Sequence, residues 1–321
     1  MDASRRLSPG RLRRLREELE EEQLGILGHS AAPELLVDEI DYALRPPRHE
    51  RRLPTYGAIV TPSHPTERWK DATGLDLTLS PTARRADAEV RRYADGEVSW
   101  AVRDADGVSA LAVFDRAASS ERDVVILAEA TGAAVVQRCH DGVVRVAGPF
   151  GVARWDGTGW HLEPPIGQWL GQTVLTHGTP RQCEVLDQLF AFAVHDLGAS
   201  GIGALLVLGD VGTASIEDHL PDPPPLRLDR PEALGPLRHV LAQTDGAAVF
   251  DADGVLRRLG ARLIPSPAAE RATEVVGGTR HISGKRFSYD APAATVVVVS
   301  DDGPVTAFRG GAMVGRSPAD T

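Results

Sequence analysis

A short segment near the C-terminal end of the chain carries side chains that can bind a triphosphate. Arg280 can bind phosphate oxygens through two N–H groups at once. Thr279 and Ser300 offer hydroxyl groups, and the pair Gly277-Gly278 lets backbone N–H groups approach an anion closely. These residue types together predict a phosphate-binding turn.

Two carboxylates flank this segment. Asp245 opens a strand-like segment, and Asp301 follows the valine-rich run 296–299. Carboxylate oxygens are hard ligands of the kind that Mg²⁺ or Mn²⁺ prefers. Each residue also has an ordinary alternative, because Asp245 could cap a turn and Asp301-Asp302-Gly303 could form a hairpin turn. Since Asp245 is followed by Gly-Ala and is paired with the later phosphate-binding segment, we interpret it as catalytic.

Three further residues have an ordinary structural reading. Arg280 could be half of a surface ion pair, but its position after Gly-Gly-Thr favours phosphate binding. His281 could be a structural histidine that bonds to the backbone, and Leu263 could be an ordinary core residue.

The segments around these residues alternate between helices and strands. An apolar stripe at helical spacing covers 186–197, and a buried strand is predicted at 203–208. A second helix is predicted from about 229 to 243, followed by strands to about 250 and 263, a loop to Arg280 and a strand ending near 300. This alternation predicts a mixed β-sheet flanked by helices.

The first half of the chain has a different pattern. From 85 to 163, short strands are predicted, among them 98–102, 109–114 and 124–127, with turn residues between them. Trp155 and Trp160 either line a ligand pocket or form a cross-strand pair that supports a hairpin. The pair Pro164-Pro165 marks the expected boundary between this half and the next.

Bulk composition excludes several classes of protein. The net charge of −10 argues against a protein that coats DNA or RNA, so no nucleic-acid partner is expected. The chain has two cysteines, which fits a reducing compartment and a cytoplasmic location. No apolar run is long enough to span a bilayer, and the first residues lack the apolar core of a secretory signal, so no membrane association is expected.

Four segments in this order resemble the diadenylate cyclase (DAC) domain, which is the nucleotide-binding domain of DNA-integrity-scanning proteins and of membrane-bound cyclic di-AMP synthases. They are Gly203-Ala204-Leu205, Asp245-Gly246-Ala247, Gly278-Thr279-Arg280-His281 and Ser300-Asp301-Asp302. The resemblance covers roughly 180–311. It implies an α/β DAC-like domain at 166–315, behind a strand-rich α+β domain at 85–165 with a sensor or regulatory role. Residues 1–84 are expected as a helical and irregular N-terminal extension.

The same resemblance implies an activity. It implies a nucleotidyltransferase that condenses two ATP into cyclic di-AMP and two pyrophosphates, as a homodimer or higher oligomer. The expected cofactor is Mg²⁺ or Mn²⁺, with Co²⁺ as a further candidate, held by Asp245 and Asp301. Asp245 is the expected catalytic residue. The implied nucleotide-binding residues are Gly246, Ala247, Leu263, Gly278, Thr279, Arg280, His281 and Ser300.

Two departures from the family pattern leave an alternative open. Position 282 is Ile where the family usually has a second Arg, and Lys285 and Arg286 are the nearest candidates to replace that cation. The closing acid after Ser300 is Asp301 where Glu is usual. The alternative function is a non-catalytic nucleotide sensor with a DAC-like fold. A synthase of a different linkage or base is a third hypothesis.

Overall fold

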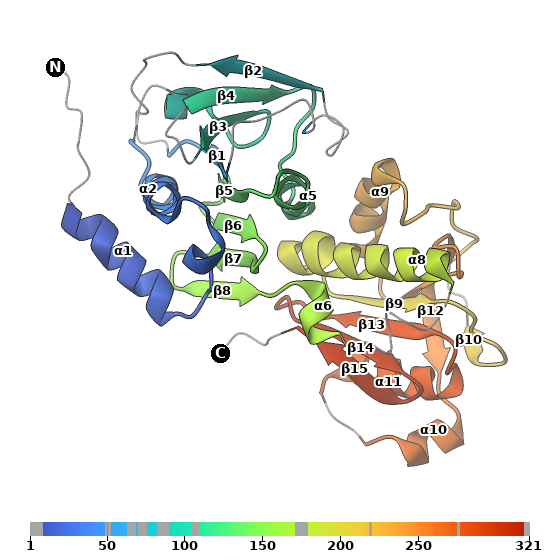
Figure 1. Cartoon of the computed structure of the whole chain (residues 1–321). Helices are drawn as coiled ribbons and strands as arrows, with labels where there is room; N and C mark the ends of the chain where they lie inside the picture. Colours follow the sequence, from blue (N-terminus) through green and yellow to red (C-terminus); the bar gives the residue numbers. More distant parts are fainter. Residues whose placement is uncertain are drawn as a thin grey trace. The chain divides into compact units, whose positions relative to one another are not determined.

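The structure is a computed structural model that describes residues 9–48, 50, 53–62, 69, 76–81, 90–104, 109–170, 179–217, 220–274 and 277–317. The chain divides into two compact units, Met1–Pro165 and Ile166–Thr321, and the division follows the Pro164-Pro165 pair. In Figure 1 the first unit runs from blue to green and the second from yellow-green to red.

An eight-stranded mixed sheet forms the N-terminal unit, in the order β2-β4-β3-β1-β5-β6-β7-β8. Strand β1 lies inside the sheet, parallel to β3 and antiparallel to β5. The strands are β1 Tyr56–Thr61, β2 Leu77–Pro81, β3 Ser99–Asp104, β4 Ser109–Phe114, β5 Ala134–Arg138, β6 Val144–Gly148, β7 Gly151–Trp155 and β8 Trp160–Glu163.

Helices cover both faces of this sheet. Along β1, Ala58 and Val60 join the apolar cluster of α1 and α2, whereas Ile59 joins the cluster of α5. Because successive side chains of a strand point to opposite faces, the middle of the sheet is buried on both sides. The helices are α1 Pro9–Glu21, α2 Pro33–Leu44 and α5 Glu121–Thr131, with 3₁₀ turns η1 Leu27–His29 and η2 Arg91–Tyr93.

The N-terminal unit differs from the sequence-based expectation in two places. Residues 1–84 are not a separate extension, because β1 and β2 lie in the same sheet as the strands of 85–165. The prediction of a strand at 124–127 is wrong, since this run lies in helix α5. Ser120 and Asp123 form a capping box that starts the helix, and Gly132 ends it with a φ of 63°.

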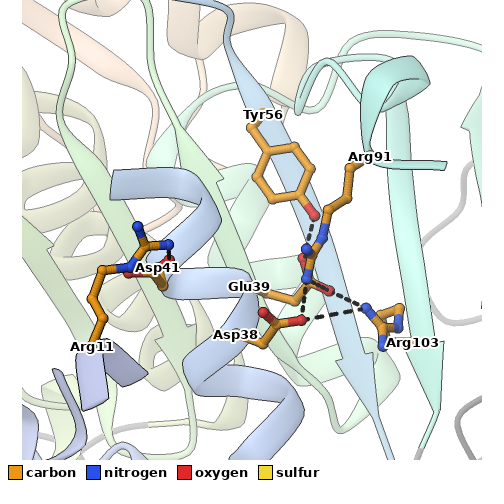
Figure 2. Close-up of polar contacts among 7 residues, drawn as sticks. All are labelled: Arg11, Asp38, Glu39, Asp41, Tyr56, Arg91 and Arg103. Carbon is orange, nitrogen blue, oxygen red and sulfur yellow. Dashed lines mark hydrogen bonds and ion pairs between the residues drawn. The ribbon is translucent and has the colours of Figure 1, made fainter. Parts of the chain in front are cut away.

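A buried ionic network joins α2 to the sheet (Figure 2). The carboxylate of Glu39, fully buried on α2, accepts hydrogen bonds from Arg91 at 2.9 and 3.0 Å and from Arg103 at 2.6 Å. The hydroxyl of Tyr56 donates to the same carboxylate. Burial raises the pKa of Tyr56 well above its usual value, so its hydroxyl keeps the proton that it donates. Each of these buried charges is therefore paired, as burial of charge requires.

A seven-stranded mixed sheet forms the C-terminal unit, in the order β10-β12-β11-β9-β13-β14-β15. Strand β9 lies near its centre, parallel to β11 and antiparallel to β13. The strands are β9 Ala204–Leu208, β10 Ser215–Glu217, β11 Ala247–Phe250, β12 Leu256–Ile264, β13 Thr295–Val299, β14 Val305–Arg309 and β15 Ala312–Arg316.

This sheet is also covered on both faces. On β9, Leu206 and Leu208 pack in the apolar cluster of α8, η3 and α9, whereas Leu205 and Val207 pack in the cluster that holds Phe287 of α11. The C-terminal unit therefore has three layers, and the predicted mixed α/β fold is confirmed. The helices are α6 Ile166–Trp169, α8 Pro180–Ala191, the π-helix η3 Phe192–Leu197, the 3₁₀ turn η4 Gly198–Ser200, α9 Pro231–Leu241, α10 Pro267–Ala272 and α11 Thr279–Asp290.

Two further observations bear on function. Trp155 and Trp160 are register partners across β7 and β8 with ring centroids 5.7 Å apart, so they form the cross-strand pair rather than a ligand pocket. Among the described helices, none combines the length and the apolar character that crossing a membrane requires.

Candidate active site

The pairing of three strands brings distant parts of the sequence to one edge of the C-terminal sheet. Because β11 is parallel to β9 and β13 is antiparallel to it, the starts of β9 and β11 lie at the same edge as the end of β13. Gly203 immediately precedes β9, Asp245 precedes β11 by two positions, and Ser300 follows β13. The register partner of Ala204 is Val299, which fixes this meeting of strand ends.

Two glycines place Asp245 in this position. Gly246 has a φ of +97°, a conformation that residues with a side chain rarely adopt. A Cβ atom on Gly246 would also lie 2.6 Å from the carbonyl carbon of Gly260 on the neighbouring strand β12. The Asp-Gly pair is therefore a tight entry into β11, and the glycine is required by both its backbone angle and the close approach of β12.

The predicted phosphate-binding turn is instead the first turn of helix α11. Gly278 is the N-cap residue, and Thr279, Arg280 and His281 follow it inside the helix. The first N–H groups of a helix have no partner within the helix, and the helix dipole places positive potential at this end. This segment therefore offers an anion both the side chains that we expected and the N–H groups of a helix N-terminus.

A cavity of about 1080 Å³ lies at this edge of the sheet. Its size suits a nucleotide-sized ligand. Nine of the ten residues expected from the sequence line it, and the exception is Ala247, which is fully buried in the apolar core behind the cavity. The expected residues that line the cavity are Asp245, Gly246, Leu263, Gly278, Thr279, Arg280, His281, Ser300 and Asp301.

Several lining residues were not expected as site residues. Glu270, on α10, faces the cavity and lies 3.7 Å from Arg286, from its Oε1 to Nη1. Ser283, one turn into α11, Asp302, after β13, and Arg262, on β12, also line it. Nothing in the local sequence of Glu270 marks it as a site residue, because its place in the cavity depends on how α10 packs. Ser283 could have been predicted from the sequence, because it lies one helical turn after Thr279 and Arg280 and so shares their face of the helix.

The charged side chains of the cavity differ in whether they have a protein partner. Arg280 Nη1 donates to Asp301 Oδ1 at 2.7 Å. The carboxylate of Asp245 has no hydrogen-bond or ion-pair partner among the residues that the structure describes. Asp245 is thus available to a ligand or a cation, whereas Arg280 and Asp301 are engaged with each other.

His281 and Leu263 each line the cavity and also contact the protein interior around it. His281 Nε2 lies 3.2 Å from the hydroxyl oxygen of Thr306 on β14. Burial lowers the pKa of His281 from its usual value, the charge of Arg316 lowers it further, and Asp302 opposes this shift. Leu263 is buried in the core cluster and also lines the cavity.

The residues that were considered as substitutes for a cation at position 282 lie outside the cavity lining. Ile282 itself is absent from the lining. Lys285 Nζ lies 3.5 Å from the carbonyl oxygen of Glu274, and Arg286 pairs with Glu270. Arg280 and Arg262 are therefore the cationic side chains that face the cavity within the described part of the chain.

The residues of the cavity fit a cation whose ligands come partly from the protein and partly from a bound substrate. Within the described ranges, no group of three or more His, Cys, Asp or Glu side chains is arranged to hold a metal ion. Mg²⁺ is often held by one or two carboxylates together with water and substrate phosphates, rather than by a cage of protein ligands. The unpartnered carboxylate of Asp245 fits that role.

Comparison with known families assigns both halves of the chain. Residues 191–313 match the family model described as "DisA bacterial checkpoint controller nucleotide-binding", abbreviated DAC. Residues 191–313 form a DAC domain. Residues 13–163 match a different family model, described as "Probable sensor domain DACNK". The DAC domain thus contains every residue that lines the cavity.

Individual proteins and solved structures also match part of the chain. A protein from Haloferax volcanii named diadenylate cyclase is 29% identical over 140 residues, which cover 40% of this chain and 51% of that protein. The chain therefore spans about half the length of the curated relative that it matches. Two crystal structures are similar. A hypothetical membrane spanning protein from Bacillus cereus is 18% identical, with a TM-score of 0.31, and the match covers 43% of this chain and 72% of the other. DacA from Staphylococcus aureus is 17% identical, with a TM-score of 0.27, and the match covers 42% and 87%.

Proposed function

We propose that the protein is a diadenylate cyclase, which condenses two ATP into cyclic di-AMP and two pyrophosphates. The observation that carries this proposal is the cavity of the DAC domain. It brings an unpartnered carboxylate, Asp245, together with Arg280 at the N-terminus of α11. These are the groups that a nucleotidyl transfer needs, because its catalysis depends mainly on positioning and on neutralising phosphate charge.

The lining residues divide into a phosphate end and a base end. At the phosphate end, Arg280, Thr279 and Ser300 hold the oxygens through their side chains, and the first turn of α11 adds backbone N–H groups. His281 contributes as a neutral donor, because its lowered pKa disfavours the charged form. Leu263 supplies an apolar wall for the adenine, together with the backbone of Gly246, while Ala247 supports this wall from behind.

The reaction exchanges bonds at the α-phosphorus of each nucleotide. The 3′-oxygen of one ribose forms a bond to the α-phosphorus of the other ATP, and the bond from that phosphorus to the bridging oxygen breaks. This happens twice, so two phosphodiester bonds form and two pyrophosphates leave. Asp245 orients the attacking hydroxyl group and helps to withdraw its proton.

A divalent cation, when bound, neutralises part of the triphosphate charge. Asp245 is the ligand that the site offers for Mg²⁺ or Mn²⁺, with Co²⁺ as a further candidate. The sequence also predicts Asp301 as a metal ligand, and in the structure its Oδ1 accepts a hydrogen bond from Arg280.

The cavity that we describe holds one nucleotide in each chain, whereas the product joins two nucleotides. We therefore expect the active form to be a homodimer or higher oligomer in which two cavities face each other around a twofold axis. Small-angle scattering with ATP and metal tests this, because a protein that stays monomeric while it makes product has another mechanism. For the N-terminal unit we propose a sensor role in the cytoplasm.

Product analysis separates this function from its alternatives. Purified protein is incubated with each nucleoside triphosphate in Mg²⁺, Mn²⁺ or Co²⁺, and the products are identified by mass spectrometry. Cyclic di-AMP and pyrophosphate in a 1:2 ratio from ATP, lost in Asp245→Asn, support the cyclase. Tight nucleotide binding without product in any metal supports the nucleotide sensor, for which Ile282 is the motivating feature. A different cyclic product supports a synthase of another base or linkage.

A further inference from the structure

The ion pair between Arg280 and Asp301 uses only part of each side chain. Arg280 Nη1 donates to Asp301 Oδ1 at 2.7 Å. Guanidinium has five N–H donors, and the Nε and Nη2 groups of Arg280 have no partner among the described residues. The pair therefore fixes the direction of the guanidinium and leaves its other donors available to a phosphate.

Gly203 leaves the space in which this pair lies. A Cβ atom at position 203 would lie 1.6 Å from Asp301 Oδ1 and 2.4 Å from Arg280 Nη1, so both side chains would have to move. The backbone of Gly203 does not have a positive φ, and the atoms it meets are the ends of two flexible side chains. The absence of a side chain at position 203 is thus needed for the ion pair and not for the backbone conformation.

Holding Arg280 in advance lowers the cost of binding a phosphate. A free arginine side chain has large rotamer entropy, and its loss on binding weakens affinity by an amount comparable to about 0.5–1.5 kcal/mol. A carboxylate that already restrains the guanidinium has removed part of that freedom before the ligand arrives. The remaining N–H donors then form charge-assisted hydrogen bonds to phosphate oxygens.

We propose that Asp301 is a positioning residue that holds Arg280 for the phosphate chain of the ligand, and that Gly203 is required because it makes room for this pair. The inference rests on the proposed function to the extent that the ligand is a triphosphate. It assigns Asp301 a role toward Arg280 in place of a primary role as a metal ligand.

The test substitutes Gly203, which changes neither charge. Binding of a non-hydrolysable ATP analogue with Mg²⁺, of inorganic tripolyphosphate and of adenosine is measured by calorimetry for wild type, Gly203→Ala, Arg280→Gln and the double variant. We expect Gly203→Ala to weaken binding of both phosphate ligands by roughly 2- to 10-fold, the entropic cost converted to affinity, and to leave adenosine unchanged. In the Arg280→Gln background, Gly203→Ala should cause no further loss.

Gly167→Ala is the matched control, because Gly167 lies in helix α6 and no atom of the described residues lies within 4 Å of an added Cβ. It should bind as wild type. Circular dichroism and the thermal midpoint test whether Gly203→Ala is folded. If Gly203→Ala is not folded, Asp301→Ala takes its place, because it removes the same ion pair without adding a Cβ at position 203. For tripolyphosphate, Asp301→Ala should likewise have no effect once Arg280 is Gln.

Four results overturn the proposal. The first is phosphate binding by Gly203→Ala that equals wild type, and the second is a loss that persists at full size without Arg280. The third is an Asp301→Asn variant whose half-saturating Mn²⁺ concentration rises equally with and without Arg280. The fourth is wild-type protein that fails to bind tripolyphosphate. Wild-type protein that binds phosphate in the expected pattern but makes no cyclic di-AMP overturns only the cyclase proposal.

Discussion

His281 Nε2 lies 3.2 Å from Thr306 Oγ1, and this contact joins the first turn of α11 to strand β14. The imidazole also lies edge-on to Phe308, with ring centroids 6.2 Å apart. The same turn is also held by the pair between Arg280 and Asp301. The proposed phosphate-binding turn is thus anchored by two contacts before any ligand binds.

The titration of His281 should report this environment. Burial and the nearby Arg316 lower its pKa below 6.5, so we expect an imidazole NMR titration midpoint below that value. The unfolded chain binds more protons in this window, so the contribution of His281 makes folding less stable as pH falls through 6.5. Arg316→Gln should raise the midpoint, because it removes the second cause of the shift.

Arg257→Gln is the control for this titration. Arg257 is 59% exposed on β12 and its charge is not one of those that shift the pKa of His281, so the midpoint should not move. Two results would contradict the burial and the charge effect that we describe. They are a wild-type midpoint at or above 6.5 and a midpoint that does not change in Arg316→Gln.

Asp245→Asn should remove synthesis and spare binding. The amide keeps the shape of the carboxylate but loses the charge that holds a cation and the basicity that withdraws a proton. We expect the rate of cyclic di-AMP formation to fall by roughly 10²–10⁴-fold, with affinity for an ATP analogue in the absence of divalent metal within about threefold of wild type. Turnover is followed by chromatography of the product. Near-normal turnover would take Asp245 out of the catalytic role.

Nine of the residues that line the cavity were predicted from the sequence, and the reasons why others were missed are physical. Asp245, Arg280 and Ser300 were found because their residue types and order carry chemistry. Ala247 was assigned to the site as the third residue of the Asp-Gly-Ala motif, but its side chain is fully buried in the apolar cluster that contains Leu263 and Phe287. Glu270 was missed because no local pattern reports the packing of α10.

The difference between local sequence patterns and tertiary packing also explains the two wrong predictions in the first half of the chain. The parallel pairing of β1 with β3 joins residues on either side of a long connection, and such a contact leaves no local periodicity. The run 124–127 is rich in β-branched residues, yet the capping box at Ser120 and burial of Val124, Leu127 and Ala128 at helical spacing decide for α5. Tertiary packing overrides strand propensity in this segment.

Gly246→Ala tests the tight entry into β11. Alanine at a φ of +97° is strained, and its Cβ would meet the backbone of Gly260. We expect the free energy of unfolding of the C-terminal unit to fall by about 1–3 kcal/mol, measured by chemical denaturation. Gly167→Ala, which meets no neighbouring atom, should be neutral or slightly stabilising. Equal stabilities for the two variants would contradict the close approach of β12.

Glu39→Ala tests the buried network of the N-terminal unit (Figure 2). Removing this carboxylate leaves Arg91 and Arg103 without their shared acceptor in a buried site. We expect a loss of about 3–5 kcal/mol in the free energy of unfolding of this unit, measured by urea denaturation. Glu34→Ala on the same helix is the control. Its side chain is 77% exposed, so the loss of its pair with Arg16 should cost about 0–1 kcal/mol.

The lining residues of the cavity that the structure describes lie between Leu205 and Asp302, within one continuous stretch of the DAC domain. Exchanging residues 13–163 for another sequence, in evolution or in the laboratory, therefore leaves the identity of each of these lining residues unchanged.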